Sequence, residues 1–199
     1  MNINVILIVA CSFLIGSIPF GFIFTKKLAG VDVRTVGSGN IGSTNVKRAA
    51  GSKISLYTQI MDILKGLIPV VLAMLLYPYL NTNLDKDLVM SLCAVFAILG
   101  HDYTPFLKFK GGKGVNTTLG SFLLICPIPV LLSVLTHKVL GFVTNIVSIR
   151  SLLLGFVIPV AAYFMNYNKG VVLCALVAAI LIVIRHESNI RRLINGDEK

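Results

Sequence analysis

The sequence predicts an all-α membrane protein, a single domain over residues 1–199 in which seven transmembrane helices cross the bilayer. Hydrophobic residues make up 56% of the chain and charged residues only 13%, and the mean hydropathy is +0.88. Water-soluble domains rarely show this balance. The apolar residues also come in long runs, without the alternation of soluble strands or the single apolar face of soluble helices.

Seven apolar runs define the expected helices. They are Ile3–Phe24, Ile54–Leu80, Leu88–Leu99, Val115–Leu135, Val139–Ile149, Leu152–Met165 and Val171–Ile184. Several are shorter than the roughly 20 residues that a straight crossing needs, so we expect short, tilted or broken helices, with five crossings as the alternative. The first run lacks the basic start and the small-residue cleavage site of a signal peptide, so we expect it to be a helix of the protein.

The charge of the loops predicts the orientation. With the N-terminus outside, fourteen basic residues fall in inner loops and three in outer loops, as the positive-inside rule requires. The inner residues are Lys26, Lys27, Arg34, Lys47, Arg48, Lys53, Lys108, Lys110, Lys113, Arg150, Arg185, Arg191, Arg192 and Lys199, and the outer ones are Lys86, Lys138 and Lys169. An odd number of crossings then leaves the C-terminus in the cytoplasm.

The remaining composition narrows the chemistry. The net charge is +10, but the basic residues lie between apolar runs and no aromatic stacking platform accompanies them, so we do not expect a nucleic-acid partner. The four cysteines each lie inside an apolar run without paired spacing, so we expect neither a metal site nor a disulfide, and no cofactor. His137, beside Lys138, is expected to be a solvated residue of an outer turn.

The first inner loop has the composition of an anion site. It reads G-S-G-N-I-G-S-T-N-V-K-R from Gly37 to Arg48. Its glycines allow positive φ angles that point successive N–H groups at one anion, and its hydroxyl and amide side chains add donors. The Arg48 guanidinium is suited to a bidentate bond with phosphate. A flexible glycine-serine linker is the alternative, although such linkers seldom interleave asparagines.

The second inner loop, G-H-D-Y-T-P-F-L-K-F-K-G-G-K-G, runs from Gly100 to Gly114 and leads into an expected helix. Glycines before a helix N-terminus form a phosphate cradle, and Lys113 adds a positive charge. The Walker spacing is absent, so we do not expect an ATPase. A basic membrane-surface anchor built on Lys108 and Lys110 is the alternative.

A third polar segment, R-H-E-S-N-I-R-R-L-I-N-G-D-E, ends the chain at Arg185–Glu198. If the last helix continues through it, His186 and Asn189 share one face. Alone, this segment has the composition of a basic amphipathic tail lying on lipid headgroups. Within an expected span, Asp62 and Lys65 are three residues apart and can neutralise each other as an ion pair.

The residues alone predict a membrane protein that binds a phosphorylated substrate from its inner side. The chain has eight acidic residues and no Ser-His-Asp order or carboxylate pair, which argues against a hydrolase. A site rich in cations and hydrogen-bond donors suits one or two phosphate groups. A transporter for phosphorylated solutes is the competing class, although the outer loops lack the polar residues of a second gate.

At these loops the chain closely resembles the bacterial acyl-phosphate:glycerol-3-phosphate acyltransferase family. The matching blocks are G-S-I-P-F-G at Gly16–Gly21, G-S-G-N-x-G-x-T-N-V-x-R at Gly37–Arg48, D-x-x-K-G at Asp62–Gly66, G-H and F-K-G-G-K-G-V within Gly100–Val115, and R-H-x-x-N-I-x-R-L and G-x-E within Arg185–Glu198. The resemblance implies a seven-helix fold in the bacterial inner membrane, surrounded by lipid and open to the cytoplasm. Its substrates are acyl phosphate and glycerol 3-phosphate, and its products are lysophosphatidic acid and phosphate.

The resemblance also implies the site residues. The expected catalytic residues are Arg48, Lys113, His186 and Asn189. The expected substrate-binding residues are Ser38, Gly39, Asn40, Asn45, Arg48, Gly111, Gly112, Lys113, Gly114, Ser148, Ser151, His186 and Asn189. In this scheme Ser38 and Arg48 hold glycerol 3-phosphate, and the loop ending at Lys113 holds the acyl phosphate.

The chain departs from the family pattern at a few positions. Ile41 and Ser43 replace a proline-like residue and an alanine, Pro105 comes one place late, Asn116 replaces an alanine and Asn145 replaces an arginine. Arg150 is the candidate to restore the charge that is lost at Asn145.

Overall fold

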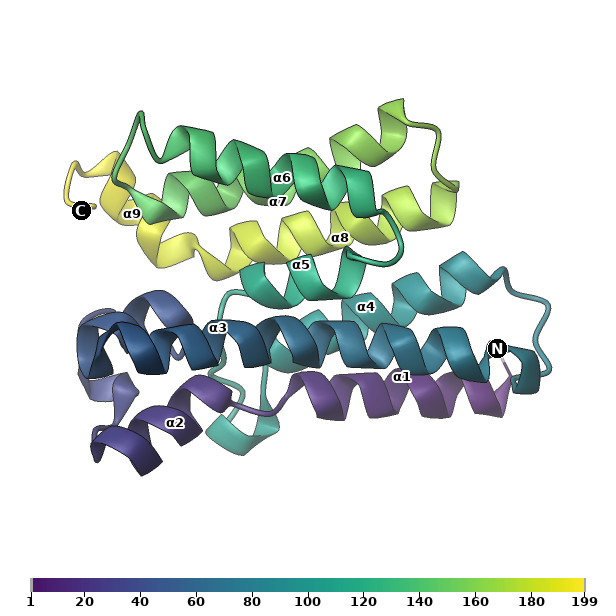
Figure 1. Cartoon of the computed structure of the whole chain (residues 1–199), viewed down its shortest axis with the longest axis horizontal. Helices are drawn as coiled ribbons and strands as arrows, with labels where there is room; N and C mark the ends of the chain where they lie inside the picture. Colours follow the sequence, from purple (N-terminus) through teal and green to yellow (C-terminus); the bar gives the residue numbers. More distant parts are fainter. Residues whose placement is uncertain (1, 199) are drawn as a thin grey trace.

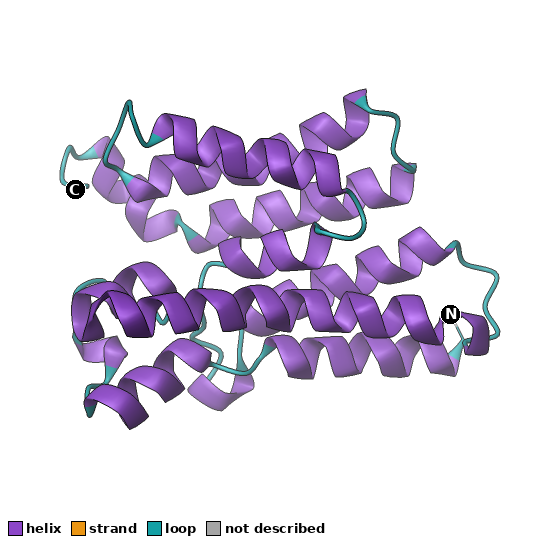
Figure 2. Ribbon diagram, in the orientation of Figure 1, coloured by secondary structure: helices purple, strands orange, loops and turns teal. Residues whose placement is uncertain are grey.

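The computed structural model describes residues 2–198 as a bundle of helices, with no strand among these residues (Figures 1 and 2). The expectation of an all-α fold is therefore confirmed. The helices are α1 (Ile3–Gly16), α2 (Phe20–Ala29), α3 (Ser43–Leu76), α4 (Lys86–Asp102), α5 (Val115–Phe122), α6 (Pro127–Leu140), α7 (Val147–Phe164), α8 (Lys169–Arg185) and α9 (Glu187–Ile194), with 3-10 turns η1 (Val33–Thr35), η2 (Tyr77–Tyr79) and η3 (Pro105–Leu107).

Four helical stretches are long and apolar enough to cross a membrane, and five if α8 and α9, which meet at a bend of 59°, count as one. The four are Ile3–Ala29, Ser43–Tyr79, Lys86–Leu107 and Val147–Phe164, and α6 is a shorter apolar helix. These stretches support a polytopic membrane protein. Many large apolar side chains on these helices are exposed, as a lipid-facing surface requires.

The helices form two groups joined by α4 and α5. Figure 1 shows α6, α7 and α8 on one side and α1, α2 and α3 on the other. Helix α4 contacts α1, α3 and α8. Helix α5 contacts α3 and also α6, α7 and α8. The N-terminus and the C-terminus lie at opposite ends of the bundle (Figure 1). We call the end with the C-terminus, α9 and the 30–42 loop the site end.

The prediction of a separate helix at Val139–Ile149 is wrong. Its first residues end α6 and its last residues begin α7, and the chain turns between Gly141 and Ile146. The Thr144 hydroxyl accepts a hydrogen bond of 3.1 Å from the N–H of Ile146, a local bond that competes with helix continuation. Counting apolar residues did not detect this turn, because Phe142, Val143 and Ile146 continue the apolar sequence through it.

The expected helix at Val115–Leu135 is also divided. Helix α5 ends at Phe122 and α6 begins at Pro127. Proline fits the first turn of a helix, where its missing N–H costs nothing, but it disrupts a helix interior. Because α6 therefore runs back toward the site end, His137 and Lys138 lie there, and their assignment to an outer turn is wrong.

Candidate active site

Asn45 organises the first glycine-rich loop. Its side chain is only 2% exposed. Its Oδ1 atom accepts a 3.0 Å hydrogen bond from the N–H of Ser38, and its Nδ2 atom donates to the carbonyls of Val33, Val36 and Asn40 at 3.0, 2.9 and 2.9 Å. One buried amide therefore fixes the path of the loop from η1 to the start of α3.

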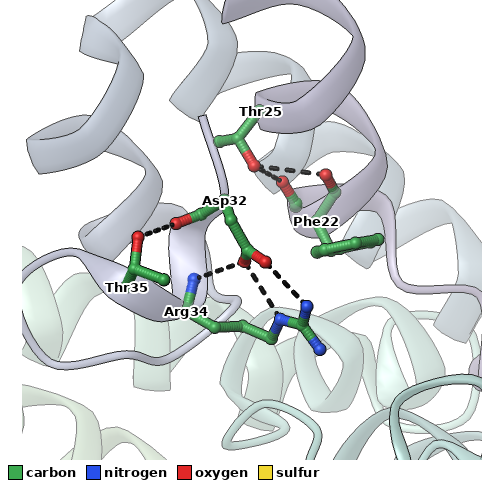
Figure 3. Close-up of polar contacts among 6 residues, drawn as sticks. Phe22, Thr25, Asp32, Arg34 and Thr35 are labelled. Atoms are coloured by element: carbon green, nitrogen blue, oxygen red, sulfur yellow. Dashed lines mark hydrogen bonds and ion pairs between the residues drawn. The ribbon is translucent and has the colours of Figure 1, made fainter. Parts of the chain in front are cut away.

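Arg34, which precedes this loop, is engaged away from the cavity. Its Nη2 and Nε atoms donate to the Asp32 carboxylate at 2.6 and 3.0 Å, as Figure 3 shows. The guanidinium also stacks over Phe22 at 4.7 Å from the ring centroid. Hydrogen bonds from the Arg34 side chain and main chain lower the pKa of Asp32 to about 2. Arg34 therefore links η1 to α2.

The second loop folds back on the end of α4. The N–H groups of Gly111 and Gly112 donate to the carbonyls of Asp102 and His101 at 3.2 and 3.0 Å. A Cβ atom on Gly112 would lie 1.9 Å from Nε2 of His101, so only glycine fits there. His101, which the sequence suggested to lie in a loop, is a 4% exposed residue in the last turn of α4.

Arg185 clamps the second loop from the end of α8. Its Nε atom donates to the carbonyl of Gly112 at 3.0 Å, and its Nη2 atom donates to that of Gly111 at 3.2 Å. Its guanidinium stacks over the Tyr103 ring at 4.9 Å. These contacts join α8 to the loop and leave Lys113 free to point toward the third polar segment.

The bend between α8 and α9 presents His186 and Asn189 to the same space. The His186 Nδ1 atom lies 2.8 Å from the carbonyl of Ile182, so in the neutral ring Nδ1 carries the proton and Nε2 carries the lone pair. Lys113 Nζ donates to Oδ1 of Asn189. The second and third polar segments are therefore hydrogen-bonded to each other.

Glu198 ties the end of the chain into this network. Its carboxylate accepts hydrogen bonds from Asn189 Nδ2 and Arg192 Nε, each at 2.6 Å, and from the Ser148 hydroxyl at 2.9 Å. Burial alone would raise the pKa of Glu198, but the hydrogen bonds from these three groups outweigh it and lower the pKa. Glu198 was not among the expected site residues, although it ends the G-x-E block of the family pattern.

One cavity of about 610 Å³ opens among these segments. Nine of the expected site residues line it: Ser38, Asn40, Asn45, Arg48, Lys113, Gly114, Ser148, His186 and Asn189. A smaller hollow of about 230 Å³ adjoins it and shares Ser38, Asn40 and Lys113. The three inner segments that the sequence singled out therefore meet around one space.

Four expected site residues do not line the cavity. Gly39 has a positive φ of 68° and forms the turn behind Ser38. Gly111 and Gly112 are buried against the end of α4, as described above. Ser151 is 6% exposed, one helical turn beyond Ser148 on α7. In the structure these residues support the wall of the cavity.

Several lining residues were not expected. They include Ser43, Ser55, Gln59, Asp62, His101, Asn116, His137, Arg192 and Glu198. His137 reaches the cavity from the last turn of α6, which the missed break at Cys126-Pro127 concealed. Arg150, the candidate to replace the lost arginine, does not line the cavity.

Burial has the largest influence on the pKa of Lys113. It lowers the pKa of Lys113 to about 8, and the positive charges of Arg192, Arg48 and Arg185 act in the same direction, while the Glu198 carboxylate opposes them. An anionic ligand beside Lys113 would be attracted by this cluster of cations.

The expected ion pair of α3 is confirmed. Lys65 Nζ lies 2.9 Å from Asp62 Oδ1, and both side chains are almost fully buried. Lys65 also donates to the carbonyl of Ile18, at the break between α1 and α2, at 2.8 Å. His101 Nδ1 lies 3.7 Å from the same carboxylate oxygen. Residues 2–198 contain no group of three or more His, Cys, Asp and Glu side chains that is arranged to hold a metal ion.

Comparison with known proteins decides between the classes that the sequence left open. The family model described as glycerol-3-phosphate acyltransferase matches residues 6–196. The chain belongs to this family. A glycerol-3-phosphate acyltransferase of Clostridium acetobutylicum is 51% identical over 99% of this chain and 100% of its own length, and one of Syntrophotalea carbinolica is 41% identical over 94% and 92%.

A solved structure agrees with the family assignment. The glycerol 3-phosphate form of PlsY (YgiH), an integral membrane glycerol 3-phosphate acyltransferase, has a TM-score of 0.88 at 36% identity, covering 98% of this chain and 94% of that chain. Its lysophosphatidic acid form has a TM-score of 0.86 at 35% identity, with the same coverage. This acyltransferase is therefore an enzyme and a membrane protein, and the comparisons give no support to the transporter alternative.

Proposed function

We propose that this acyltransferase transfers an acyl group from acyl phosphate to the 1-hydroxyl of sn-glycerol 3-phosphate. The products are lysophosphatidic acid and inorganic phosphate, and the reaction is the first acylation of phospholipid synthesis. The observation that carries the proposal is the convergence of Arg48, Lys113 and His186, from three separate segments, on one cavity. This cavity is rich in donors and cations, which suits two phosphate groups.

The acceptor, glycerol 3-phosphate, and the donor, acyl phosphate, bind to different walls of the cavity. Arg48 and Ser38 of the first loop bind the phosphate of glycerol 3-phosphate, Arg48 through its planar fork of donors. Lys113, at the end of the second loop, binds the phosphate of the donor among the cations that line the cavity. Asn189 accepts from Lys113 and so holds the ammonium group toward the donor.

Transfer proceeds by direct attack, without an acyl-enzyme. The 1-hydroxyl oxygen forms a bond to the acyl carbon, and the bond from that carbon to the phosphate oxygen breaks. Acyl phosphate is a mixed anhydride with a good leaving group, so orientation and charge stabilisation provide most of the rate. The hydroxyl proton passes to the leaving phosphate or to Nε2 of His186, and Lys113 stabilises the departing charge.

The protein is proposed to cross the bacterial inner membrane seven times as one domain, with α5 and α6 as separate short crossings. The N-terminus lies outside and the C-terminus in the cytoplasm, because the basic loops gather at the site end. The acyl chain then lies between helices in the inner half of the bilayer, and the cavity opens to the cytoplasm. No cofactor takes part in this scheme.

The decisive assay incubates radiolabelled glycerol 3-phosphate and palmitoyl phosphate with detergent-solubilised protein. Radiolabelled lysophosphatidic acid is the expected product, and palmitoyl-CoA should not replace palmitoyl phosphate. Equal turnover of both donors would overturn the donor assignment. Binding of glycerol 3-phosphate without product would favour a transporter.

Two substitutions separate the roles of the walls. Arg48→Ala should raise KM for glycerol 3-phosphate, because it removes a charged hydrogen-bond donor to the phosphate. Arg191→Ala is the control, because Arg191 is exposed on α9 and does not line the cavity. Lys113→Ala should lower turnover with acyl phosphate far more than it lowers the amount of folded protein. Unchanged kinetics for Arg48→Ala would remove that residue from the site.

A further inference from the structure

One wall of the cavity carries a pair of uncharged polar residues that the mechanism does not use. Ser43 is the first residue of α3 and Asn116 is the second residue of α5, and both line the cavity. Asn116 Nδ2 donates a hydrogen bond of 3.2 Å to the Ser43 hydroxyl oxygen. Both side chains are half-buried, so each keeps a surface toward the cavity.

The separation of this pair is set by close packing of the two helices. A Cβ atom on Gly66 of α3 would lie 2.3 Å from the carbonyl oxygen of Thr117, and one on Gly120 of α5 would lie 1.9 Å from that of Ile63. The main chains of α3 and α5 are therefore in direct contact. Small residues at such a contact leave the helices little room to slide, so the Ser43–Asn116 bond has a rigid frame.

The unused hydrogen-bonding capacity of the pair matches a hydroxyl group. In residues 2–198 no hydrogen bond engages Oδ1 of Asn116, and the Ser43 hydroxyl hydrogen remains available because its oxygen is the acceptor in the bond to Asn116. Together they offer one acceptor and further donors. A hydroxyl uses both, whereas the amide oxygen would repel a phosphate dianion, which accepts only.

We propose that Ser43 and Asn116 read the 2-hydroxyl of the acceptor and make the enzyme selective for a hydroxylated three-carbon phosphate. The cations Arg48 and Lys113 line the same cavity, so a phosphate held among them leaves the uncharged pair for the glycerol backbone. This inference rests on the proposed function.

The test compares two acceptors in the palmitoyl phosphate assay. One is glycerol 3-phosphate, and the other is propane-1,3-diol monophosphate, which keeps the reacting hydroxyl and the phosphate but lacks the 2-hydroxyl. Asn116→Ala should lower kcat/KM for glycerol 3-phosphate about three- to tenfold, the range of one uncharged hydrogen bond, and leave the diol phosphate unchanged. Ser43→Ala and the double variant should lose the same selectivity, because each breaks the same pair.

The outcomes separate the inference from the proposed function. An equal loss with both acceptors would mean that the pair only braces the helices, and no loss with either would mean that it does not contact the acceptor; both results overturn the inference. Wild-type protein inactive with both acceptors would overturn the proposed function itself. An unchanged KM for palmitoyl phosphate shows that the variants fold, and Asn116→Ser, which keeps a hydroxyl, should recover part of the selectivity.

Discussion

Replacing Asn45 with alanine should release the first loop, while Ser38 and Arg48, the residues proposed to bind the acceptor phosphate, keep their own side chains. The substitution breaks one bond in which Asn45 accepts and three in which it donates, all with main-chain groups of residues 33–40. A net value of about 1 kcal/mol for each bond gives roughly 3–4 kcal/mol, since one N–H is shared between two carbonyls. Glycerol 3-phosphate must then order the loop on binding, so kcat/KM for this substrate should fall about 10- to 100-fold.

The measurement is initial-rate kinetics with each substrate varied in turn, together with the apparent melting temperature in detergent. Asn83→Ala is the matched control, because Asn83 is exposed in the loop between η2 and α4 and does not line the cavity. The effect should be larger on KM for glycerol 3-phosphate than on KM for acyl phosphate, because Lys113 belongs to a different loop. An Asn45→Ala enzyme with the kinetics of the Asn83→Ala control would refute the reasoning that this amide builds the acceptor site.

Three further predictions follow from burial and packing. Lys113 loses its charge as the pH rises through its pKa of about 8. The value of kcat/KM for acyl phosphate should therefore be highest below that pH and fall above it. Lys113→Arg should move this fall to higher pH, because arginine keeps its charge. Asp62→Ala should destabilise the protein by about 3–5 kcal/mol, since it leaves the Lys65 charge buried and unpaired, and adding Lys65→Met should recover part of the lost thermal stability. Gly120→Ala should lower the melting temperature, because its methyl group would overlap the main chain of α3. Gly155→Ala is the control and should have a smaller effect, because its methyl group would meet only a side chain. Equal melting temperatures of the two variants would contradict this account.

The sequence predicted the helical class and the three polar inner segments because both depend on local signals. Long apolar runs specify helices in a bilayer, and glycines with basic residues mark the loops that bind anions. The Asp62–Lys65 pair was predicted for the same reason, since residues three apart face each other on any helix. In each case the residues that decide the structure are close in the chain.

The misplaced boundaries have a physical explanation. The break between α5 and α6 depends on Pro127, and the turn before α7 depends on one Thr144 hydroxyl, both hidden within apolar sequence. The resulting reversal of one helix moved His137 from the expected outer side into the cavity. A proline rule applied inside apolar runs would have found the first break but not the second, and it would also have broken α3 at Pro69 and α7 at Pro159, which lie inside helices.

The supporting residues of the site depend on contacts between distant segments. Glu198 meets Ser148 across 50 residues, and Asn116 meets Ser43 across 73. No spacing within one segment predicts such contacts, because they are set by how the helices pack. The resemblance identified nine of the residues that line the cavity, and the structure identified others, such as Glu198, that hold them in position.

The central claim is that both phosphates occupy one cavity together, so that the acceptor attacks the donor directly. Initial rates measured over a grid of glycerol 3-phosphate and palmitoyl phosphate concentrations test it, because a complex that holds both substrates gives double-reciprocal lines that intersect. The account predicts this intersecting pattern. Parallel lines, the signature of an acyl-enzyme that forms and releases phosphate before the acceptor binds, would contradict it.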